Sequence, residues 1–524
     1  MSDHRNPKWS FYIDRGGTFT DVMAYDPNGQ PHTLKLLSQD IRHYSDPVIE
    51  GIRRVMGIAK NQSLSTEDIE LVHVGTTLAT NALLERKGAR VLWITHQGFK
   101  DALLIGHQNR QYLFEQQIPP HIPLYETVAE ISGRVNAKGQ SIETLDIEAL
   151  KRHLESAKQA GIESVGVCTF HAPLYPELEQ KIGHHIEAFG FSTLSLSHQI
   201  SPHMGWVDRA HTTLVDAYLS PIIQQYAQSL NQALNPAGQD HEVDLRFMKS
   251  DGGLSRYDHL RGHQALLSGP AGGLVGCLET AKDCGLNQVI AFDMGGTSTD
   301  VAFLAGQGQT VMEYAIDGMN LTTPTLDIHT IASGGGSCIH FDGQRLSVGP
   351  TSAGAAPGPA CYRLNGPLTT TDCNVILGRL SPNYLPKKFG PSRNEAIDSI
   401  APQTLMQALR QEVNQQTGQN LSIEELAQGC IDIAVTQMAN AIKKVTSQRG
   451  HDVSQAALNC FGGAGGQHAL AVAEELGLSE VLIHPLSGIL SAVGLSMGKP
   501  TELVEFSLER DLDQVTDDEL DELF

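Results

Sequence analysis

One eight-residue pattern occurs twice in this chain of 524 residues and constrains the fold more than any other feature. Residues 14–21 read D-R-G-G-T-F-T-D and residues 293–300 read D-M-G-G-T-S-T-D, so six of the eight positions are identical. Apolar runs flank both copies. Each copy therefore predicts a strand, a tight glycine turn and a second strand. The two copies lie much farther apart than solenoid repeats do, which indicates two related domains that face each other.

The composition of this pattern is typical of a phosphate site. Glycines let backbone N–H groups approach an anion without interference from a Cβ atom, and a concave row of such amides binds phosphate. The aspartate that opens each copy, Asp14 or Asp293, would repel a phosphate directly, so it implies a cation between them, most simply Mg²⁺. Two facing hairpins can hold a polyphosphate and its metal from both sides. The alternative is a pair of ordinary hairpin turns that share Gly-Gly-Thr by chance.

Three further segments combine glycine with polar residues, and each is a weak signal when taken alone. Residues 75–81, G-T-T-L-A-T-N, follow an expected strand and begin a helix, which suits either an anion site or an ordinary helix cap. Residues 98–110 form a polar loop, either solvated or in contact with a substrate. Residues 462–466, G-G-A-G-G, lie between an expected strand at 457–461 and an expected helix at 467–476, and suit the base and ribose of a nucleotide.

The net charge of −22 at pH 7 argues against partners that need a basic surface. Nucleic acids and anionic membrane surfaces both require lysine and arginine patches, so neither is expected here. No apolar run approaches the ~18 residues of a membrane span, and no N-terminal signal pattern is present. The eight cysteines include no Cys-x-x-Cys pair and lie mostly in apolar segments, which indicates reduced thiols and a cytoplasmic location.

Three expectations of secondary structure bear on the site. Residues 211–226 predict a crossover helix out of the first domain, with Pro221 marking a kink or break. Residues 267–273, L-S-G-P-A-G-G, predict a glycine turn that opens a helix over 274–284. Residues 422–449 predict the clearest helix, because Ser422 and Glu425 form a capping box and Gly450 follows its end.

Taken together, these stretches resemble the hydantoinase A/oxoprolinase family, whose fold belongs to the superfamily of actin, heat-shock chaperones and sugar kinases. The resemblance spans nearly the whole chain and rests on residues 14–21, 75–88, 98–110, 249–254, 268–273, 293–301, 332–337, 349–362 and 461–469. It implies an α/β protein with two duplicated ribonuclease H-like domains of the actin-like ATPase fold and a nucleotide cleft between them. It also implies ATP, where the residues alone indicate only a polyphosphate.

The resemblance and the residue pattern point to the same candidate site. Asp14 and Asp293 are expected to hold Mg²⁺, directly or through water, and are the candidate catalytic residues. Phosphate contacts are expected from Gly16, Gly17, Thr18, Thr20, Gly295, Gly296, Thr297 and Ser298, and adenosine contacts from Gly462, Gly463, Gly465 and Gly466. Magnesium would offset the charge that develops in phosphoryl transfer. Asp21 and Asp300 are candidate general bases by position only, and they can equally cap their own turns.

Within the family, the chain is most similar to members of the 5-oxoprolinase type. These imply ATP-dependent opening of a cyclic amide, in which 5-oxoproline is phosphorylated on its amide oxygen and converted to glutamate. The same chemistry in an N-methylhydantoinase, or an acetone-carboxylase-type subunit acting on another substrate, remains an alternative. A nucleotide-dependent scaffold or switch without a small-molecule substrate is an alternative of a different class. An iron–sulfur ATPase activator would need clustered cysteines, which the sequence lacks.

The expected organisation has three parts: a first ATPase domain over residues 1–210, a second over 211–500, and the start of a C-terminal segment over 501–524. In the oxoprolinase arrangement a hydantoinase B-like half follows this region, so a B-like subunit or half is the expected partner; self-association is left open. Residues 516–519, T-D-D-E, begin a fresh capping box close to the last residue, and residues 511–522 carry seven carboxylates. We expect this acidic run to be solvated unless another segment covers it.

Overall fold

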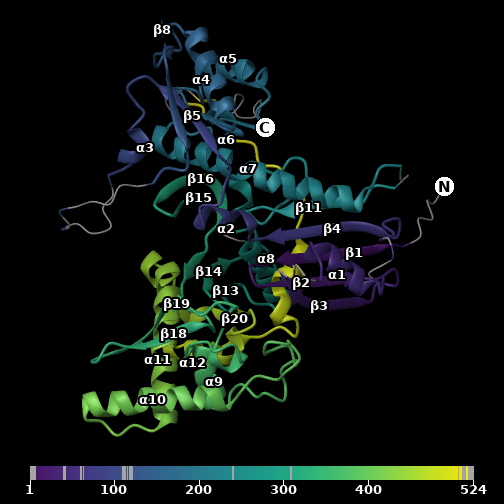
Figure 1. The fold of residues 1–524 in the computed structure, drawn as a ribbon, viewed down its shortest axis with the longest axis vertical. Coiled ribbons are helices and arrows are strands. Elements are labelled where there is room, and N and C mark those ends of the chain that lie inside the picture. Colours follow the sequence, from purple (N-terminus) through teal and green to yellow (C-terminus); the bar gives the residue numbers. More distant parts are fainter. Residues whose placement is uncertain are drawn as a thin grey trace.

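The computed structural model describes residues 7–505 apart from 39, 41–42, 60–61, 63, 109–113, 115, 117–121, 239–240 and 307–309, together with residues 507–509, 515 and 516. Most of the acidic run at 511–522 and the last two residues of the polar loop at 98–110 therefore lie outside the described part. Figure 1 shows three sheets with their helices: one containing β1 and β4, one containing β5, and one containing β13 and β20.

The first phosphate-type hairpin forms the middle of a six-stranded sheet with the order β12-β11-β4-β1-β2-β3. Strands β1, β2 and β3 are antiparallel neighbours, whereas β4 runs parallel to β1 and β11 runs parallel to β4. The strands are β1 (Trp9–Arg15), β2 (Phe19–Tyr25), β3 (Pro31–Leu37), β4 (Ile69–Thr76), β11 (Asp244–Met248) and β12 (Leu254–Arg256). The carboxyl ends of β1, β4 and β11 consequently lie at one edge of this sheet.

The second hairpin forms the middle of a five-stranded sheet with the order β17-β14-β13-β20-β21. Its strands are β13 (Gln288–Met294), β14 (Thr299–Ala305), β17 (His329–Ile331), β20 (Ala457–Phe461) and β21 (Val481–Leu482). The first three are antiparallel, and β20 and β21 follow parallel to β13, so the strand directions repeat those of β3-β2-β1-β4-β11. This shared order confirms the duplication that the repeated octapeptide predicts.

A third sheet, with the order β10-β9-β5-β6, is inserted between β4 and β11. Its strands are β5 (Val91–His96), β6 (Thr127–Ile131), β9 (Ser164–Val167) and β10 (Thr193–Leu196), and it packs against α4 (Ile147–Gln159) and α5 (Glu177–Glu187). Helix α7 (Trp206–Leu234) then leads back to the first sheet and continues through Pro221, so the predicted end at residue 226 is too early.

The remaining elements are short helices and pairs of short strands. The short helices are α1 (Pro47–Val55), α2 (Leu78–Leu84), α3 (Ala102–Ile105) and α6 (Ser197–Ile200). The paired short strands are β7 (Arg134–Val135) with β8 (Ser141–Glu143), β15 (Thr310–Ile316) with β16 (Met319–Leu326), and β18 (Ser337–Phe341) with β19 (Leu346–Ser352). In the described part of the chain, no helix is long and apolar enough to cross a membrane.

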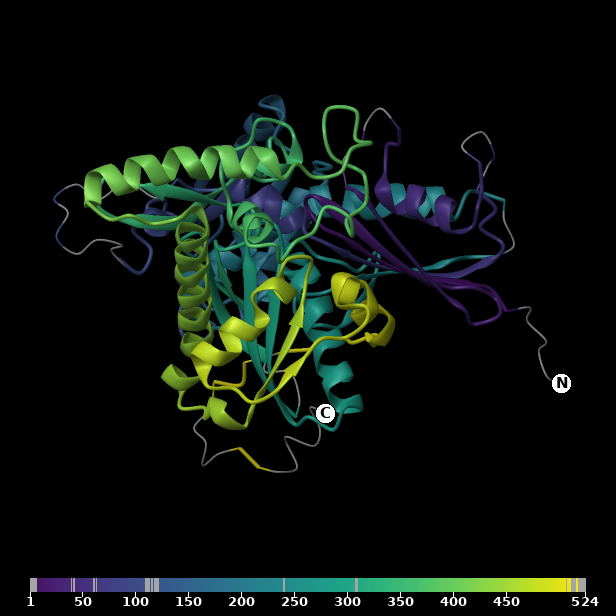
Figure 2. The ribbon, with the colours of Figure 1, turned by 90° about the horizontal axis from the view of Figure 1, so that it is seen from below.

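Helix α11 (Ile423–Val445) covers one face of the second sheet, with α9 (Thr370–Ile376), α10 (Ile400–Thr417) and α12 (Ala469–Leu476) beside it. The predicted capping box is confirmed: the Ser422 side chain accepts from the Glu425 backbone N–H, and the Glu425 side chain accepts from the Ser422 backbone N–H. Figure 2 shows α10 and α11 at an angle to each other at one side of the molecule.

Two glycine-rich helices, α8 (Ser268–Asp283) and α13 (Leu490–Met497), lie between the two hairpin sheets in a shared apolar core. The prediction of a glycine turn over 267–273 is wrong, because the helix already begins at Ser268. The glycines serve contact between helices instead. A Cβ on Gly276 would lie 2.7 Å from Leu490 O, and one on Gly494 would lie 1.9 Å from Gly272 O.

Strands β11 and β12 follow residue 210 in the chain but complete the first sheet. The parallel pairing of β11 with β4 thus joins sequence from both sides of the expected division at residue 210. The division of the chain into 1–210, 211–500 and 501–524 remains a prediction.

Candidate functional site

The turn of the first hairpin presents backbone amides at the carboxyl end of β1. Asp14 pairs with Asp21 across β1 and β2, and the Gly16 N–H donates to Phe19 O at 3.1 Å, which closes a tight turn. Gly17 is exposed and Thr18 is half-buried. Thr20 is different, because its fully buried hydroxyl lies 2.9 Å from the Ser38 hydroxyl.

The turn of the second hairpin has the same construction. Asp293 pairs with Asp300 across β13 and β14, and the Gly295 N–H donates to Ser298 O at 3.0 Å. Gly296 and Thr297 are exposed at its tip, so their backbone groups are accessible to a ligand.

The carboxylate of Asp14 lies in a space that glycines keep open. A Cβ on Gly75, at the end of β4, would lie 3.1 Å from Asp14 Oδ1, and a Cβ on Gly269, in the first turn of α8, would lie 3.3 Å from it. Asp14 Oδ1 is buried and has no hydrogen-bond partner among the described residues. A buried, unpartnered carboxylate oxygen is costly, which indicates that it accepts a ligand contact.

Asp293 stands in an equivalent position beside the third glycine turn, which consists of residues 462–466. A Cβ on Gly462, at the end of β20, would lie 2.3 Å from Asp293 Oδ1. Gly462 also has a φ of +83°, which an L-residue rarely adopts. The parallel pairing of β13 with β20 therefore brings this glycine turn and the second hairpin to one edge of the sheet.

Neighbouring carboxyls contribute to the pKa values of both Asp14 and Asp293. Burial, and then the neighbouring Asp21, raises the pKa of Asp14 to about 7, while Lys35 and Ser491 act in the opposite direction. Burial raises the pKa of Asp293 well above its usual range, followed by the charges of Asp300, Asp14 and Asp21. Because the charges of Asp14 and Asp21 reach Asp293, the two hairpins share one electrostatic environment.

This carboxylate environment fits a divalent cation. Burial also raises the pKa of Asp300 to about 6, against a hydrogen bond from the Thr330 hydroxyl. No group of three or more His, Cys, Asp or Glu side chains that could hold a metal occurs in the described ranges. Mg²⁺ matches such a site, since it is commonly held by one or two carboxylates and completes its coordination with phosphate oxygens and water.

Lys35 is a polar residue of this region that the sequence analysis missed. Its Nζ atom lies 2.5 Å from Asp21 Oδ1 and 3.2 Å from the carbonyl oxygen of Gly488. It thereby joins the first hairpin to the segment that precedes α13. Its place on β3, alternating with apolar residues, resembled any solvated strand position, so no local signal distinguished it.

The backbone of residues 333–336 packs against the turn of the second hairpin. The Gly335 N–H donates to Gly295 O at 3.1 Å, and the Gly336 N–H donates to Gly296 O at 2.6 Å. A Cβ on Gly334 would lie 2.7 Å from the carbonyl carbon of Thr297. The sequence analysis used residues 332–337 only for the family resemblance, and their contact with the hairpin required the tertiary structure.

The third glycine turn also reaches the second hairpin. The Ala464 N–H donates to Met294 O at 2.9 Å. Gly465 is buried, and a Cβ there would lie 2.7 Å from Cys460 Sγ, so this glycine serves packing. Gly463 and Gly466 are exposed with open space around them. Of the four predicted adenosine contacts, these two have accessible backbone.

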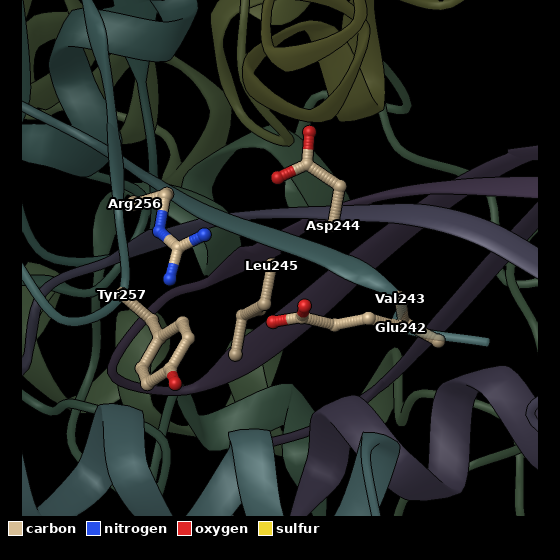
Figure 3. Close-up of a pocket in the computed structure, with 6 residues that line it drawn as sticks. All are labelled: Glu242, Val243, Asp244, Leu245, Arg256 and Tyr257. Atoms are coloured by element: carbon tan, nitrogen blue, oxygen red, sulfur yellow. The ribbon is translucent and has the colours of Figure 1, made fainter. Parts of the chain in front are cut away.

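A surface hollow of about 200 Å³ lies away from these turns (Figure 3). It is lined by Glu242 just before β11, by Leu245 near the start of β11, and by Arg256 and Tyr257 at the end of β12. The start of β11 is the end opposite to the carboxyl edge where the first hairpin turn lies, so this hollow is not part of the candidate site.

Comparison with known proteins shows the family of the chain. The descriptions Hydantoinase/oxoprolinase and Hydantoinase/oxoprolinase N-terminal region match residues 209–503 and 10–190. The 5-oxoprolinase of Saccharomyces cerevisiae is 40% identical over 94% of this chain, and the match covers 41% of that protein. The caprolactamase subunit alpha of Pseudomonas jessenii is 31% identical over 92% of this chain and 69% of its own length. The chain thus spans about two-fifths of the yeast relative.

Two solved structures share the fold. The ATP-dependent caprolactamase from Pseudomonas jessenii superposes with a TM-score of 0.77 at 29% identity, covering 93% of this chain and 70% of that chain. Nucleotide-free acetone carboxylase gives a TM-score of 0.76 at 22% identity, covering 94% and 70%, and this likeness shows the fold alone. From the matched descriptions and the identity to these relatives, the chain belongs to the hydantoinase/oxoprolinase family.

Proposed function

We propose that this chain binds Mg-ATP between its two hairpin turns and transfers the γ-phosphoryl group to the amide oxygen of a small cyclic amide. The observation that carries the proposal is the pair of carboxylates, Asp14 and Asp293, each at the mouth of a glycine turn and each beside a glycine whose missing Cβ leaves room for it. Asp14 Oδ1 is buried without a hydrogen-bond partner among the described residues. The charges of Asp14 and Asp21 in the first hairpin act on Asp293 in the second, which supports a ligand shared between the two hairpins.

Each part of the site has a proposed role. Asp14 and Asp293 would hold Mg²⁺, which offsets the negative charge of the phosphates and of the transition state. The backbone N–H groups of Gly17, Thr18, Gly296 and Thr297, with the Ser298 side chain, would contact phosphate. Gly16 and Gly295 would instead close the two turns, because their N–H groups donate to Phe19 O and Ser298 O. Gly463 and Gly466 would border the adenosine. Thr20 and Gly465 would support the turns from inside, because the first is bonded to Ser38 and the second is buried.

The substrate that we propose first is 5-oxoproline, with glutamate as the final product. Support comes from the 40% identity to the yeast 5-oxoprolinase over 94% of this chain. A different lactam or hydantoin is the runner-up, favoured by the 31% identity to the caprolactamase subunit alpha. A panel of these compounds separates the two, with lactam-dependent ADP formation as the measurement. ADP formation that is independent of every cyclic amide would instead favour the hypothesis of a nucleotide-dependent scaffold or switch.

We further propose that hydrolysis of the activated amide needs a hydantoinase B-like partner. Opening the ring requires water at the activated carbon, a task that the hairpin site does not address. The 524-residue chain should therefore form no glutamate from 5-oxoproline and ATP until a B-like subunit is added. Mg²⁺-dependent glutamate release by the chain alone, abolished in Asp14→Asn, would contradict this. All eight cysteines are free, which supports the proposal that the chain works in the reducing cytoplasm.

A further inference from the structure

A small polar cavity lies at the same edge of the first sheet as the hairpin turn. Its volume is about 160 Å³, and its lining includes Lys249, Arg261 and His263. An engineered protein cavity of about 150 Å³ admits benzene, so this space is large enough for a ring of five or six atoms. No role has been given to it above.

The strand register places this cavity close to the phosphate site. Phe247 of β11 pairs with Val74 of β4, and Val74 pairs with Ile13 of β1, so Lys249 follows the same row of residues as Arg15. Adjacent strands lie about 4.8 Å apart, which separates the ends of β1 and β11 by about 10 Å. In α/β sheets, ligands characteristically bind beyond the carboxyl ends of the strands.

One continuous segment connects the cavity to Asp14. Gln264 lines the cavity, and its carbonyl oxygen accepts from the Ser250 hydroxyl at 2.8 Å. Four residues later the Ser268 hydroxyl donates to Thr76 O at 2.6 Å, and the next residue is Gly269, whose missing Cβ leaves room for Asp14 Oδ1. A ligand in the cavity and a phosphate at the hairpin would thus contact two ends of the same rigid segment.

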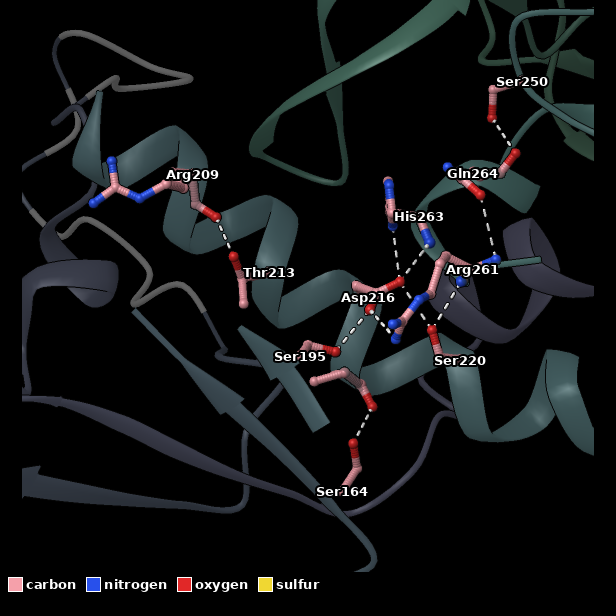
Figure 4. A network of polar contacts seen from close by, with 12 residues as sticks. Ser164, Ser195, Arg209, Thr213, Asp216, Ser220, Ser250, Arg261, His263 and Gln264 are labelled. Atoms are coloured by element: carbon pink, nitrogen blue, oxygen red, sulfur yellow. Dashed lines mark hydrogen bonds and ion pairs between the residues drawn. The ribbon is translucent and has the colours of Figure 1, made fainter. Parts of the chain in front are cut away.

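The cavity contains an oriented histidine. Asp216 of α7 is completely buried. Its Oδ1 atom lies 2.8 Å from His263 Nδ1 and accepts a hydrogen bond from the Ser220 hydroxyl, also at 2.8 Å. Its Oδ2 atom accepts from the Ser195 hydroxyl at 2.7 Å. Figure 4 shows these groups gathered around the Asp216 carboxylate. Since Nδ1 is engaged, His263 Nε2 is the ring nitrogen left for a ligand, and it has no hydrogen bond among the described residues.

The carboxylate of Asp216 is ionised and can stabilise a protonated imidazole. Burial by itself would raise its pKa, but His263, Arg261 and the Ser195 hydroxyl hold that pKa far below its usual range. An aspartate that orients a histidine through Nδ1 and stabilises its cationic form is a recurrent device for proton transfer at Nε2.

Arg261 is the cation of the cavity with hydrogen-bonding capacity to spare. The other cavity cation, Lys249, is already paired, because its Nζ atom lies 2.9 Å from Asp251. The carboxylate of Glu505, which also lines the cavity, lies 3.9 Å from His203. Arg261 has only a 3.9 Å ion pair with Asp216, whose oxygens are occupied by shorter bonds, and its guanidinium makes no hydrogen bond within the described ranges. A guanidinium with free N–H groups is suited to bidentate recognition of a carboxylate.

We propose that this cavity binds the cyclic amide, with Arg261 on the carboxylate of 5-oxoproline and His263 Nε2 on its amide N–H. This rests on the proposed function. In the step, the amide oxygen forms a bond to the γ-phosphorus of ATP, and the bond from that phosphorus to the β-phosphate oxygen breaks. The amide nitrogen forms the C=N double bond as its proton passes to His263 Nε2. The products are the O-phosphorylated cyclic imidate, ADP and a protonated His263, with Asp216 as the positioning residue.

The carboxylate contact is tested by calorimetry on the full chain saturated with Mg²⁺ and a non-hydrolysable ATP analogue. The probes are 5-oxoproline and 2-pyrrolidinone, the same ring without the carboxylate. Wild type should prefer 5-oxoproline, and Arg261→Met should weaken its binding between about 10-fold and 100-fold, the range of charge-assisted hydrogen bonds, while leaving 2-pyrrolidinone unchanged. Arg256→Met, an exposed arginine in the hollow of Figure 3, is the matched control and should bind both as wild type does.

The proton transfer is tested by ADP formation that depends on 5-oxoproline. His263→Gln should lower kcat about 100-fold or more, with KM for 5-oxoproline within about twofold, because the residue acts on the proton and not on the carboxylate. The exposed His259, changed to Gln, should leave both constants unchanged. His263→Asn provides a second replacement, and unfolding temperature and Mg-ADP affinity report whether each variant is folded.

The outcomes separate this inference from the function on which it rests. Wild type that binds Mg-ADP but neither binds 5-oxoproline nor forms ADP in its presence would overturn the cavity assignment and leave the nucleotide site standing. Equal affinity of Arg261→Met and wild type for 5-oxoproline would also overturn it. Failure to bind Mg-ADP would instead refute the proposed function.

Discussion

Gly462 and Asp293 lie so close that a Cβ atom on the glycine would be 2.3 Å from Asp293 Oδ1. The contact joins the end of β20 to the second hairpin. It links this glycine to the carboxylate that we propose for Mg²⁺, and not only to the proposed adenosine contact. A side chain here would have to displace the carboxylate that we assign to Mg²⁺.

The first prediction follows from this contact. Gly462→Ala should weaken Mg-ADP binding by about 10-fold or more, since Asp293 must move. It should also destabilise the fold by at least ~1–2 kcal/mol, through its φ of +83° and because the added Cβ would lie 2.5 Å from Met294 O. Gly477→Ala is the control, because its φ is +70° but nothing lies within 4 Å of the added Cβ. It should lose stability alone. Calorimetry and thermal unfolding measure the two effects, and unchanged Mg-ADP affinity in Gly462→Ala would refute the prediction.

The second prediction concerns pH and Asp14 in the absence of metal and nucleotide. The folded chain keeps a proton on Asp14 up to about pH 7, whereas the unfolded chain loses it near about pH 4. Between these values the folded state binds more protons, so this residue makes the free energy of unfolding fall as pH rises through that window, and the loss is complete above pH 7. Asp14→Asn removes the titration.

Denaturant unfolding at several pH values checks this. The free energy of unfolding of Asp14→Asn minus that of wild type should increase between pH 4 and pH 8, by an amount on the order of 1–4 kcal/mol. Saturating Mg-ADP should reduce the difference, because the ligand stabilises only the wild-type carboxylate. A difference that stays constant across the range would show that Asp14 titrates like an exposed aspartate.

The third prediction concerns the contact of α8 with α13 between the two sheets. Gly494→Ala places a Cβ 1.9 Å from Gly272 O, so it should destabilise the fold by ~1–3 kcal/mol or more, as overpacked cores do. Gly429→Ala lies in α11 with open space around it and should stabilise the fold by ~0.5–1 kcal/mol, since alanine is the better helix former. Equal unfolding temperatures for the two variants would disprove the assigned role of Gly494.

What the sequence could predict depended on how local its cause was. The two hairpins follow from apolar runs around Gly-Gly-Thr, and α11 follows from the Ser422–Glu425 capping box, because turns and caps are determined by residues a few positions apart. The strand 457–461 was predicted with its observed bounds for the same reason. The prediction of ATP as the ligand needed the family resemblance in addition.

What the sequence could not predict depended on contacts between distant segments. The glycines of residues 268–273 look like a turn, but they allow α8 to approach α13 and Asp14, more than 200 residues away in the chain. Lys35 and residues 333–336 gain their positions from tertiary packing. Because the third sheet is inserted in the sequence between β4 and β11, the sequence does not indicate that β11 completes the first sheet. Asp216, His263 and Arg261 carry no motif at all.

The central claim is that the two hairpins share one metal-bound nucleotide, and calorimetry with Mg-ADP tests it most directly. The measurement compares wild type, Asp293→Asn and Asp258→Asn, an exposed aspartate paired with Arg256 that controls for the change of charge. We expect wild type and Asp258→Asn to bind Mg-ADP alike, and removal of Mg²⁺ with a chelator to weaken both. Asp293→Asn should bind at least about 10-fold more weakly, with little further loss on chelation. Folded wild type that binds no nucleotide, or Asp293→Asn with wild-type affinity and wild-type dependence on Mg²⁺, would contradict it.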